Sequence, residues 1–461
     1  MGLFRKKEMS TENNGQSMGE AVSSVDNHME QAEERDSRKC YARLEELFRE
    51  QDSGVVMKLY IENFKRLNEL FGYDYCEELL GHILSFLKGE TGCEIYRYVG
   101  VEFIVVLKGY TQGQASRLAE QIGERFEHGW TVGDTDCLCS VQIGLCSYPG
   151  YPQNADEMLK CLDMAVFKVA EQGSNQYVMY DSKLHNENLR RQAITRYLRT
   201  ALEKNEIEVR YRPTYNTRSE RFSRAEFYMR IFIKDVGMIG AGEFIPIAED
   251  SGQIRAVEYY ALDQVGAVIA KLVAAGKEFD SIALPISPVL LLQEDFLDEV
   301  VRVIGRYQIP AGKLAIEIDE YAMSTAYVRI TELMQALSEL GVELILNHFG
   351  SGYSGLSQIF ELPVDTLKFD RFFTWQLETT PQAEPIIGGL VQIAQNVGLN
   401  LIAEGVETQK QLDALNRFGC ELQQGFYYSP TLPEEIMIQV LDTSREESQA
   451  ILEQEKEKMK Q

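Results

Sequence analysis

"LAIEIDEYAMSTAYVRITELMQALSELGVELILNHF", residues 314–349, reads as a strand, a helix and a second strand in direct succession. Its two ends, residues 314–319 and 343–349, are short runs of branched apolar side chains, and the longer segment between them has helical spacing. Strands that alternate with helices in this way build a parallel sheet. We therefore expect an α/β architecture in this part of the chain.

The same alternation continues on both sides of this stretch. The predicted strands are "IEVRYRP" (207–213), "AEFYMRIF" (225–232), "SIALPIS" (281–287), "LAIEID" (314–319), "ELILNHF" (343–349), "TLKFD" (366–370), "NLIAEGV" (400–406) and "QQGFYYS" (423–429). Eight such strands in about 230 residues predict a (β/α) barrel.

Polar residues stand at or near the carboxyl ends of several predicted strands: Glu317, Asn347, His348, Lys368 and Glu404. In a barrel these ends face one pocket. Carboxylates, an amide, an imidazole and an ammonium on one rim suit metal-assisted cleavage of a phosphate ester. The alternative is that they are ordinary polar residues at strand ends.

The chain before the barrel has a different order of elements. A strand at 54–64, helices within 66–90, a hairpin at 94–109, a helix at 114–129, a strand at 137–149 and a helix at 155–173 predict a compact α+β domain. Residues 1–38 carry few branched apolar side chains and are predicted to be disordered. The predicted organisation is therefore a disordered segment 1–38, a domain 39–181, a connecting helix 182–205, a barrel 206–440 and a charged helix or tail 441–461.

Composition excludes several classes of function. The 461 residues carry a formal net charge of -25 and a pI near 4.8, which disfavours nucleic acid as a partner. No apolar run is long enough for a membrane helix, so we expect a cytoplasmic protein that does not bind membranes. Seven of the eight cysteines lie in the first 161 residues without paired CxxC spacing. Reduced, mostly buried thiols are favoured over a disulfide framework.

Longer motifs give the chain a resemblance to two known families. Residues 54–181 resemble a GGDEF domain, the diguanylate cyclase family, through "NFKRLNELFGYDYCEELL" (63–80), "RYVGVEF" (97–103), "SVQIGLCSYP" (140–149) and "LDMAVFKVAEQGSN" (162–175). Residues 190–440 resemble an EAL domain, the cyclic di-GMP phosphodiesterase family, through "FIPIAEDSGQI" (244–254), "LAIEIDE" (314–320), "HFGSGYSGL" (348–356), "LPVDTLKFDR" (362–371) and "IAEGVETQKQLDAL" (402–415). The resemblance implies a cyclase-like antiparallel sheet with helices, followed by a TIM-like barrel.

The signature turn of the first family is eroded. Its positions are Val99, Gly100, Val101, Glu102 and Phe103. In the family, the glycines let the backbone approach the GTP phosphates and the acidic third position helps to hold a metal ion. A valine methyl group cannot coordinate a cation, so this resemblance implies an inactive cyclase.

Other positions of this domain agree with that reading. Tyr60 stands where the family has its other metal carboxylate, while Glu62 keeps the second acidic place. Glu171 replaces a phosphate-contacting lysine and would repel the triphosphate. The product-inhibition motif RxxD aligns with Glu90 and Cys93 and is absent.

The positions that recognise guanine are less altered. Asn68 and Glu77 remain compatible with contacts to the base. The resemblance therefore allows weak nucleotide binding by this domain without catalysis.

The barrel keeps part of the family's site. The resemblance implies that Glu226, Glu317, Asn347 and His348 occupy metal-ligand positions, that Lys368 orients the nucleophilic water and Glu404 is the general base, and that Arg230, Asp370, Glu407 and Gln424 contact or organise the ligand.

Three metal ligands of the family are replaced. Pro285 stands for an asparagine, and Asn347 and His348 stand for two aspartates that share the metals. Two divalent cations held together need anionic oxygens around them, and this site has lost two formal negative charges. We expect no required cofactor. The pocket still allows one divalent ion, Mg²⁺, Mn²⁺ or, because of the imidazole, Zn²⁺.

Two further departures affect ligand binding. Phe227 and Tyr228 replace small and aliphatic residues and could stack a guanine, whereas Arg212 replaces a glutamine. Without bound metals the phosphates of cyclic di-GMP lose their main counter-charges. Binding of cyclic di-GMP is therefore expected to be weak or absent.

Two functions stay open. The favoured hypothesis is a noncatalytic regulator in cyclic di-GMP-type signalling that acts through a protein partner, with a homodimer through the EAL domain as a further expectation by analogy. The alternative is a slow or metal-switched phosphodiesterase that works through Glu317, His348, Glu404 and Lys368. A purely structural alternative is an inherited buried charge network in which Lys368 neutralises the glutamates.

Overall fold

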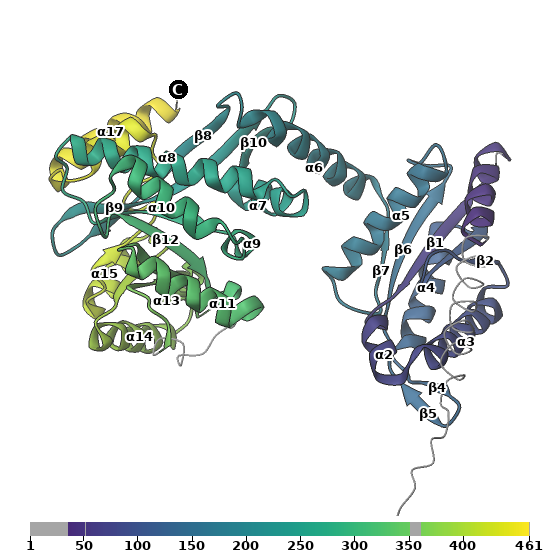
Figure 1. The fold of residues 1–461 in the computed structure, drawn as a ribbon. Coiled ribbons are helices and arrows are strands. Elements are labelled where there is room, and N and C mark those ends of the chain that lie inside the picture. Colours follow the sequence, from purple (N-terminus) through teal and green to yellow (C-terminus); the bar gives the residue numbers. More distant parts are fainter. Residues whose placement is uncertain (1–35, 51, 351–360, 461) are drawn as a thin grey trace, which may run out of the picture. The chain divides into compact units, whose positions relative to one another are not determined.

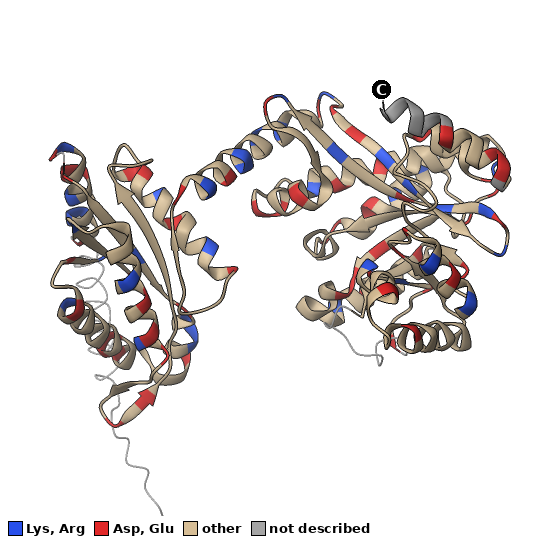
Figure 2. Cartoon of the chain, turned by 180° about the vertical axis from the view of Figure 1, so that it is seen from behind, with Lys and Arg blue, Asp and Glu red and all other residues tan. Residues whose placement is uncertain are grey.

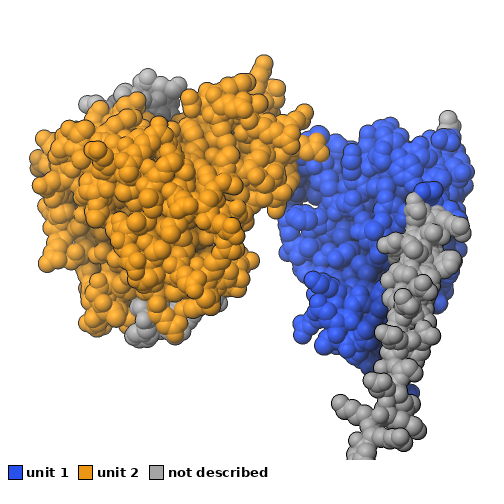
Figure 3. Space-filling view, in the orientation of Figure 1, with its two compact units in different colours: residues 1–189 blue, residues 190–461 orange. Residues whose placement is uncertain are grey.

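The computed structural model describes residues 36–50, 52–350 and 361–460 of the chain. They belong to two compact units, residues 1–189 and residues 190–461 (Figure 1, Figure 3). Of the segment predicted to be disordered, residues 1–35 lie outside the described residues and residues 36–38 are helical. They are part of a helix over residues 36–49, and the Ser37 hydroxyl donates a hydrogen bond to the Tyr98 carbonyl.

A five-stranded sheet of order β2-β3-β1-β6-β7 forms the centre of the first unit. The strands are β1 (Gly54–Ile61), β2 (Glu94–Arg97), β3 (Glu102–Lys108), β6 (Val141–Tyr148) and β7 (Tyr177–Met179). Only the β6–β7 pair within this sheet is parallel. The structure confirms the predicted α+β fold and adds β7 and a separate hairpin, β4 (Trp130–Val132) with β5 (Thr135–Cys137), which the sequence did not reveal.

Helices cover both faces of this sheet. They are α2 (Phe64–Phe71), α3 (Tyr73–Thr91), α4 (Gln112–Phe126) and α5 (Ala155–Ala170), together with residues 36–49. Alternate residues of β1 enter two different apolar clusters: Met57 packs with residues of α3 and α4, whereas Val56 packs with residues of α5 and of the helix 36–49. Burial on both faces explains why β1 reads as an almost continuous apolar run.

Eight strands close the barrel of the second unit. They are β8 (Ile207–Asn216), β9 (Arg221–Ile233), β11 (Ser281–Ile286), β12 (Leu314–Asp319), β13 (Glu343–Phe349), β14 (Thr366–Phe369), β15 (Asn400–Ala403) and β16 (Leu422–Gln423). The predicted TIM-like barrel is confirmed, with differences in the length and direction of single strands. The predicted last strand, 423–429, is reduced to β16 at Leu422–Gln423. The first strand, β8, runs antiparallel to both of its neighbours, β9 and β16, while the remaining pairs of the closed ring are parallel.

A short strand and a ring of helices surround the barrel. Strand β10 (Gly237–Gly240), which was not predicted, pairs with β9 outside the closed ring. The helices are α6 (Ser182–Ala201), α7 (Ala241–Asp250), α8 (Ile254–Ala274), α9 (Pro288–Leu291), α10 (Phe296–Tyr307), α11 (Glu320–Glu339), α13 (Arg371–Thr379), α14 (Ala383–Val397), α15 (Gln409–Phe418), α16 (Glu434–Val440) and α17 (Arg445–Lys460).

The barrel interior changes from apolar to polar along the strands. Ala283, Ala315 and Ile345 form a small apolar cluster of their own. Because side chains alternate with a period of two, Glu317 and Asn347 point the same way one step nearer the carboxyl ends. The polar pocket therefore stands on a small apolar floor.

The charged C-terminal segment is helical, as predicted, and its first half is packed. In α17, Ser448 and Leu452 are buried, and Ser444 accepts a hydrogen bond from the Ser448 hydroxyl. Acidic and basic residues are interspersed over the helices of both units in the view of Figure 2. Among the described residues, none of the helices combines the length and the apolar character that a bilayer crossing requires.

Glu258 of α8 has a buried carboxyl group, which contacts Ser287 at the start of α9. Its oxygens accept hydrogen bonds from the Ser287 amide, at 2.8 Å, and from the Ser287 hydroxyl, at 2.7 Å. Burial raises the pKa of Glu258 to about 7, although both hydrogen bonds from Ser287 act to lower it. Folding therefore makes this group harder to ionise.

A carboxyl group whose pKa rises on folding holds more protons in the folded state. The barrel should therefore lose stability as the pH rises from about 4.5 to about 7. Between pH 5 and pH 8, Glu258→Gln should gain roughly 2–3 kcal/mol in free energy of unfolding relative to the parent protein. Urea unfolding in a Trp130→Phe background reports on the barrel, because Trp375 is then the remaining tryptophan. Glu294→Gln, on the exposed turn before α10, is the control, and an equal pH dependence in both variants would contradict this account.

Candidate functional site

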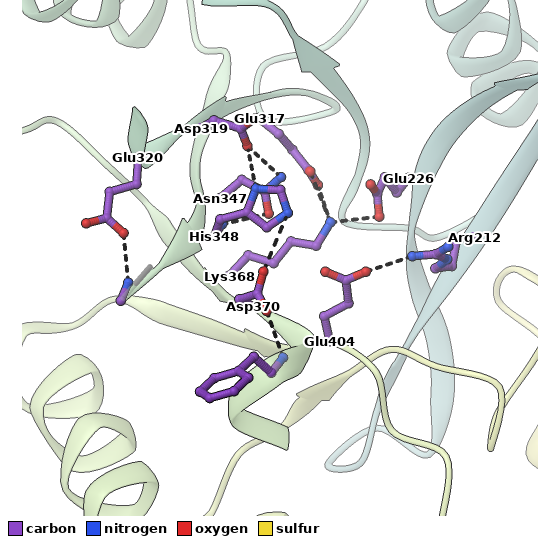
Figure 4. A network of polar contacts seen from close by, with 12 residues as sticks. Arg212, Glu226, Glu317, Asp319, Glu320, Asn347, His348, Lys368, Asp370 and Glu404 are labelled. Atoms are coloured by element: carbon purple, nitrogen blue, oxygen red, sulfur yellow. Dashed lines mark hydrogen bonds and ion pairs between the residues drawn. The ribbon is translucent and has the colours of Figure 1, made fainter. Parts of the chain in front are cut away.

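A buried lysine holds the centre of the barrel. Lys368 of β14 is 1% exposed, and its Nζ lies 2.7 Å from Oε2 of Glu226 on β9 and 3.0 Å from Oε2 of Glu317 on β12 (Figure 4). These three predicted site residues are thus brought together. Lys368 contacts two of the three glutamates that it was expected to neutralise, and the third, Glu404, pairs with Arg212.

The three groups shift one another's protonation. Burial raises the pKa of Glu317, and the neighbouring Glu226 carboxylate raises it further. Burial also acts against the charged forms of Glu226 and Lys368, but their mutual attraction outweighs it. The pKa of Glu226 is lowered, and that of Lys368 lies well above its usual value. As the pH falls, Glu317 is therefore protonated before Glu226.

A second cation enters the pocket from β8. The Arg212 Nη1 donates a hydrogen bond of 2.8 Å to Oε1 of Glu404 (Figure 4), and the guanidinium carbon lies 4.3 Å from the centre of the Tyr228 ring. Burial opposes the charge of Arg212, but the attraction of Glu226 and Glu404 raises its pKa. The predicted general base is thus paired with an arginine of this chain.

The aromatic residues predicted to stack a base do not offer free faces. Phe227 is buried in the apolar core and meets Tyr211 edge to face, with ring centres 5.7 Å apart. Because Glu226 points into the barrel, its neighbour Phe227 points outward. Tyr228 carries the Arg212 guanidinium on its ring. The hypothesis that Phe227 stacks a guanine in the pocket is wrong.

A smaller polar cluster lies at the end of β13. Oδ1 of Asp319 accepts hydrogen bonds from Asn347 Nδ2, at 3.0 Å, and from His348 Nδ1, at 2.9 Å (Figure 4). The hydrogen bond to Asp319 raises the pKa of His348, and Asp370, 3.9 Å from its Nε2, adds to that effect while burial opposes it. These contacts stabilise the protonated imidazole, and in that form the ring has no lone pair for a metal ion.

The predicted ligand-binding residues have partners within the chain. Arg230 makes a bidentate pair with Glu208, at 2.6 and 2.7 Å. Asp370 caps α13 by accepting a hydrogen bond from the Phe372 amide.

Glu407 and Gln424 belong to the loops at the end of the barrel. The Glu407 amide donates to the Gln411 side chain. The Gln424 amide group donates to Arg212 O and Thr214 Oγ1, while its buried Oε1 has no hydrogen-bond partner in the described part of the chain.

These residues do not fit a two-metal centre. Pro285 lies opposite Glu317 in the β11–β12 register and offers no side-chain donor or acceptor. The ammonium of Lys368 already pairs with both Glu226 and Glu317, at 2.7 and 3.0 Å. Within the described ranges, no three side chains of His, Cys, Asp or Glu are placed to hold a metal ion.

A buried lysine lies beside the signature turn of the first unit. Lys58 of β1 is buried, and its Nζ lies 2.8 Å from Oε2 of Glu102 and 2.6 Å from Oδ1 of Asp163. Tyr60 lies directly opposite Glu102 in the β1–β3 register. The one retained acid of the motif is therefore paired with a lysine. Of the two valines of the turn, Val99 is exposed and Val101 is half-buried.

The two residues predicted to contact guanine, Asn68 and Glu77, differ in whether they already have partners. The guanidinium of Arg97 holds both oxygens of Glu77, at 2.7 and 2.8 Å, and its Nε donates to Gly100 O. Asn68 Oδ1 is buried and has no partner among the described residues. Glu62 accepts a hydrogen bond from the Gln142 side chain. Within the described residues the Asn68 oxygen is thus unpaired but buried, whereas Glu77 is held by Arg97.

Sequence reasoning missed three functional partners. Arg212 was noted as a departure, but its pairing with Glu404 depends on strands that are distant in the chain. Asp319, which holds Asn347 and His348, was not singled out. Lys58 had a readable signal, because it is a charged residue inside the apolar strand "GVVMKLYI".

Removal of the buried ammonium should unfold the barrel more easily, because two carboxyl groups would remain buried without a cation. Lys368→Met should lower the free energy of unfolding by about 3–5 kcal/mol. Urea unfolding followed by Trp375 fluorescence, again with Trp130→Phe, measures the change. Adding Glu226→Gln and Glu317→Gln should restore most of the loss. Arg417→Gln, which removes an exposed pair with Glu384, is the control and should cost less than about 1 kcal/mol.

Comparison with known proteins agrees with this geometry. Residues 195–431 match the EAL domain family, and residues 37–176 match the family described as diguanylate cyclase, GGDEF domain. Signaling protein YkoW of Bacillus subtilis is 28% identical over 387 residues, covering 83% of this chain and 48% of that protein.

MucR of Pseudomonas aeruginosa, named a bifunctional diguanylate cyclase/cyclic di-GMP phosphodiesterase, is 26% identical over 398 residues, covering 86% of this chain and 58% of MucR. The chain thus spans about half the length of these curated relatives. A solved structure titled "PaMucR Phosphodiesterase, c-di-GMP complex" superposes with a TM-score of 0.51 and 27% identity, covering 53% of this chain and 99% of that one. The chain belongs to the EAL domain family and carries a GGDEF domain in tandem before it.

Proposed function

We propose that this protein is a noncatalytic regulator in cyclic di-GMP signalling, which acts by binding another protein and needs no metal cofactor. The observation that carries the proposal is the loss of metal ligands: Pro285, opposite Glu317, offers no side-chain donor or acceptor, and Asn347 and His348 are both paired with Asp319. The families of both domains and the activities named for relatives such as MucR support cyclic di-GMP as the signalling context.

The proposal includes an inactive cyclase domain. Synthesis of cyclic di-GMP from GTP needs metal ligands near the triphosphate, and Tyr60 and Val101 supply none. Glu102, the acid that remains, is neutralised by Lys58. Both changes point to a domain that keeps its fold without the reaction.

The ion pairs of the pocket also lead us to expect weak binding of cyclic di-GMP. A phosphodiester needs free cationic donors, but Glu208 holds Arg230 and Glu404 holds Arg212. Binding would have to break one of these pairs and leave a carboxylate near the phosphate. We expect the cost to remove most of the affinity.

An apolar groove supports the protein-partner part of the proposal. It lies in the first unit between α2 and the β4–β5 hairpin, with a volume of about 510 Å³, and Leu67, Leu70, Phe71 and Leu138 contribute to its walls. Leu70 is 64% exposed and Leu138 is 70% exposed. Grouped apolar side chains on a surface are typical of interaction sites. The expected EAL homodimer involves residues 348–356, most of which lie outside the described residues.

The 461-residue protein should neither make nor hydrolyse cyclic di-GMP. Incubation with GTP, or with cyclic di-GMP, in Mg²⁺ or Mn²⁺ should give no product by chromatography. Pro285→Asn, Asn347→Asp and His348→Asp together restore anionic ligands and should raise hydrolysis above the parent level. Hydrolysis by the unaltered protein at about 1 per second or faster would make it an enzyme and sink the proposal. So would GTP conversion that disappears with Glu102→Ala.

Direct titration separates a partner-binding protein from a nucleotide receptor. Calorimetry with cyclic di-GMP should show weak binding or none, because the guanidinium groups of Arg212 and Arg230 are already paired with carboxylates of the protein. The control is Arg417→Gln, which changes an exposed arginine pair outside the pocket. Sub-micromolar binding that Arg230→Ala abolishes and Arg417→Gln preserves would contradict the partner-first proposal.

A further inference from the structure

The three carboxyl groups of the barrel pocket, Glu226, Glu317 and Glu404, form ion pairs with a lysine and an arginine of the same chain. Lys368 neutralises Glu226 and Glu317, and Arg212 reaches Glu404 from the opposite side of the pocket (Figure 4). The two cations come from β14 and β8, which are not neighbours in the barrel. The centre thus has a fixed positive charge on two sides.

Arg212 is held in place by more than one contact. Its guanidinium lies on the Tyr228 ring, 4.3 Å from the ring centre, and donates to Glu404 at 2.8 Å. The Arg212 backbone carbonyl also accepts a hydrogen bond from Gln424. Contacts to side chain and backbone make this a preorganised cation, not a surface arginine that happens to reach inward.

We propose that Arg212 is a fixed counter-ion that keeps divalent metal ions out of the carboxylate centre. A divalent ion bound by Glu404 and Glu226 would lie beside a guanidinium and an ammonium, and like charges at such short range repel strongly even when screened. It would also have to displace Arg212 from Glu404. The pocket is therefore metal-independent, whether or not a nucleotide binds there.

Removal of this one charge should open the site. With Gln at position 212, Glu404 loses its partner, and three carboxyl groups face the single ammonium of Lys368. The oxygen of the glutamine amide and the oxygens of Glu404 and Glu226 are hard ligands of the kind that Mn²⁺ and Mg²⁺ prefer. Arg212→Lys keeps the charge and should keep metal out.

Binding of Mn²⁺ to the 461-residue protein tests the proposal directly. Electron paramagnetic resonance of free Mn²⁺ should show that Arg212→Gln binds the ion tighter than the parent by a factor of about ten or more. Thermal stability with and without MnCl₂ gives a second readout. Arg212→Lys should behave like the parent, and so should the control Arg221→Gln, which removes an arginine pair with Asp442 at the other end of β9.

Each result decides the matter. Parent protein that binds Mn²⁺ as tightly as Arg212→Gln, or a variant that binds no better than the parent, would overturn the proposal. Adding Glu404→Gln to Arg212→Gln should abolish the gained site, and retention of it would count against the assignment. If Arg212→Gln does not fold, micromolar Mn²⁺ binding by the parent or Arg212→Lys refutes the proposal, and its absence supports it. Metal entry without hydrolysis would leave the proposed regulatory function intact.

Discussion

The buried ammonium of Lys368 is the interaction on which the barrel centre depends. It links β14 to β9 and β12, strands that lie on different sides of the closed ring. Two buried carboxyl groups without a cation would carry a large desolvation penalty, and a buried lysine without carboxylates would carry a similar one. The three residues are therefore tolerable only together, and Arg212 offsets the charge of Glu404 beside them.

The first unit contains a related arrangement with weaker coupling. Lys58 joins Glu102 and Asp163, but these carboxylates are 22% and 57% exposed, so water shares in their solvation. In the barrel, by contrast, Lys368 and both glutamates are buried. In each unit a lysine on a central strand supplies positive charge next to acids that resemble those of the active families. Such pairs stabilise the fold because they satisfy the buried charges of the acids.

Much of the fold could be predicted, because strands buried on both faces leave short apolar runs between helical patterns. The direction of β8 could not, since an alternating pattern is the same in either direction. β10, with the sequence "GMIG", is too short and rich in glycine to give a strand signal.

The convergence of Glu226, Glu317 and Lys368 followed from the resemblance. The pairing of Arg212 with Glu404 did not, because it arises only when the barrel closes. The outward direction of Phe227 could have been predicted from its neighbour Glu226 by strand alternation.

Closure of the barrel by β8 also affects how the chain is made. β8 and β9 form a hairpin early in the second unit, but the other edge of β8 pairs with β16, where Asn216 lies opposite Leu422. During synthesis that edge stays unpaired for on the order of 10 s or more, because β16 is made only about 200 residues later. An open strand edge is a template for pairing with other chains. The nascent barrel therefore has a long window in which a chaperone, or another copy of the same strand, competes for the place of β16.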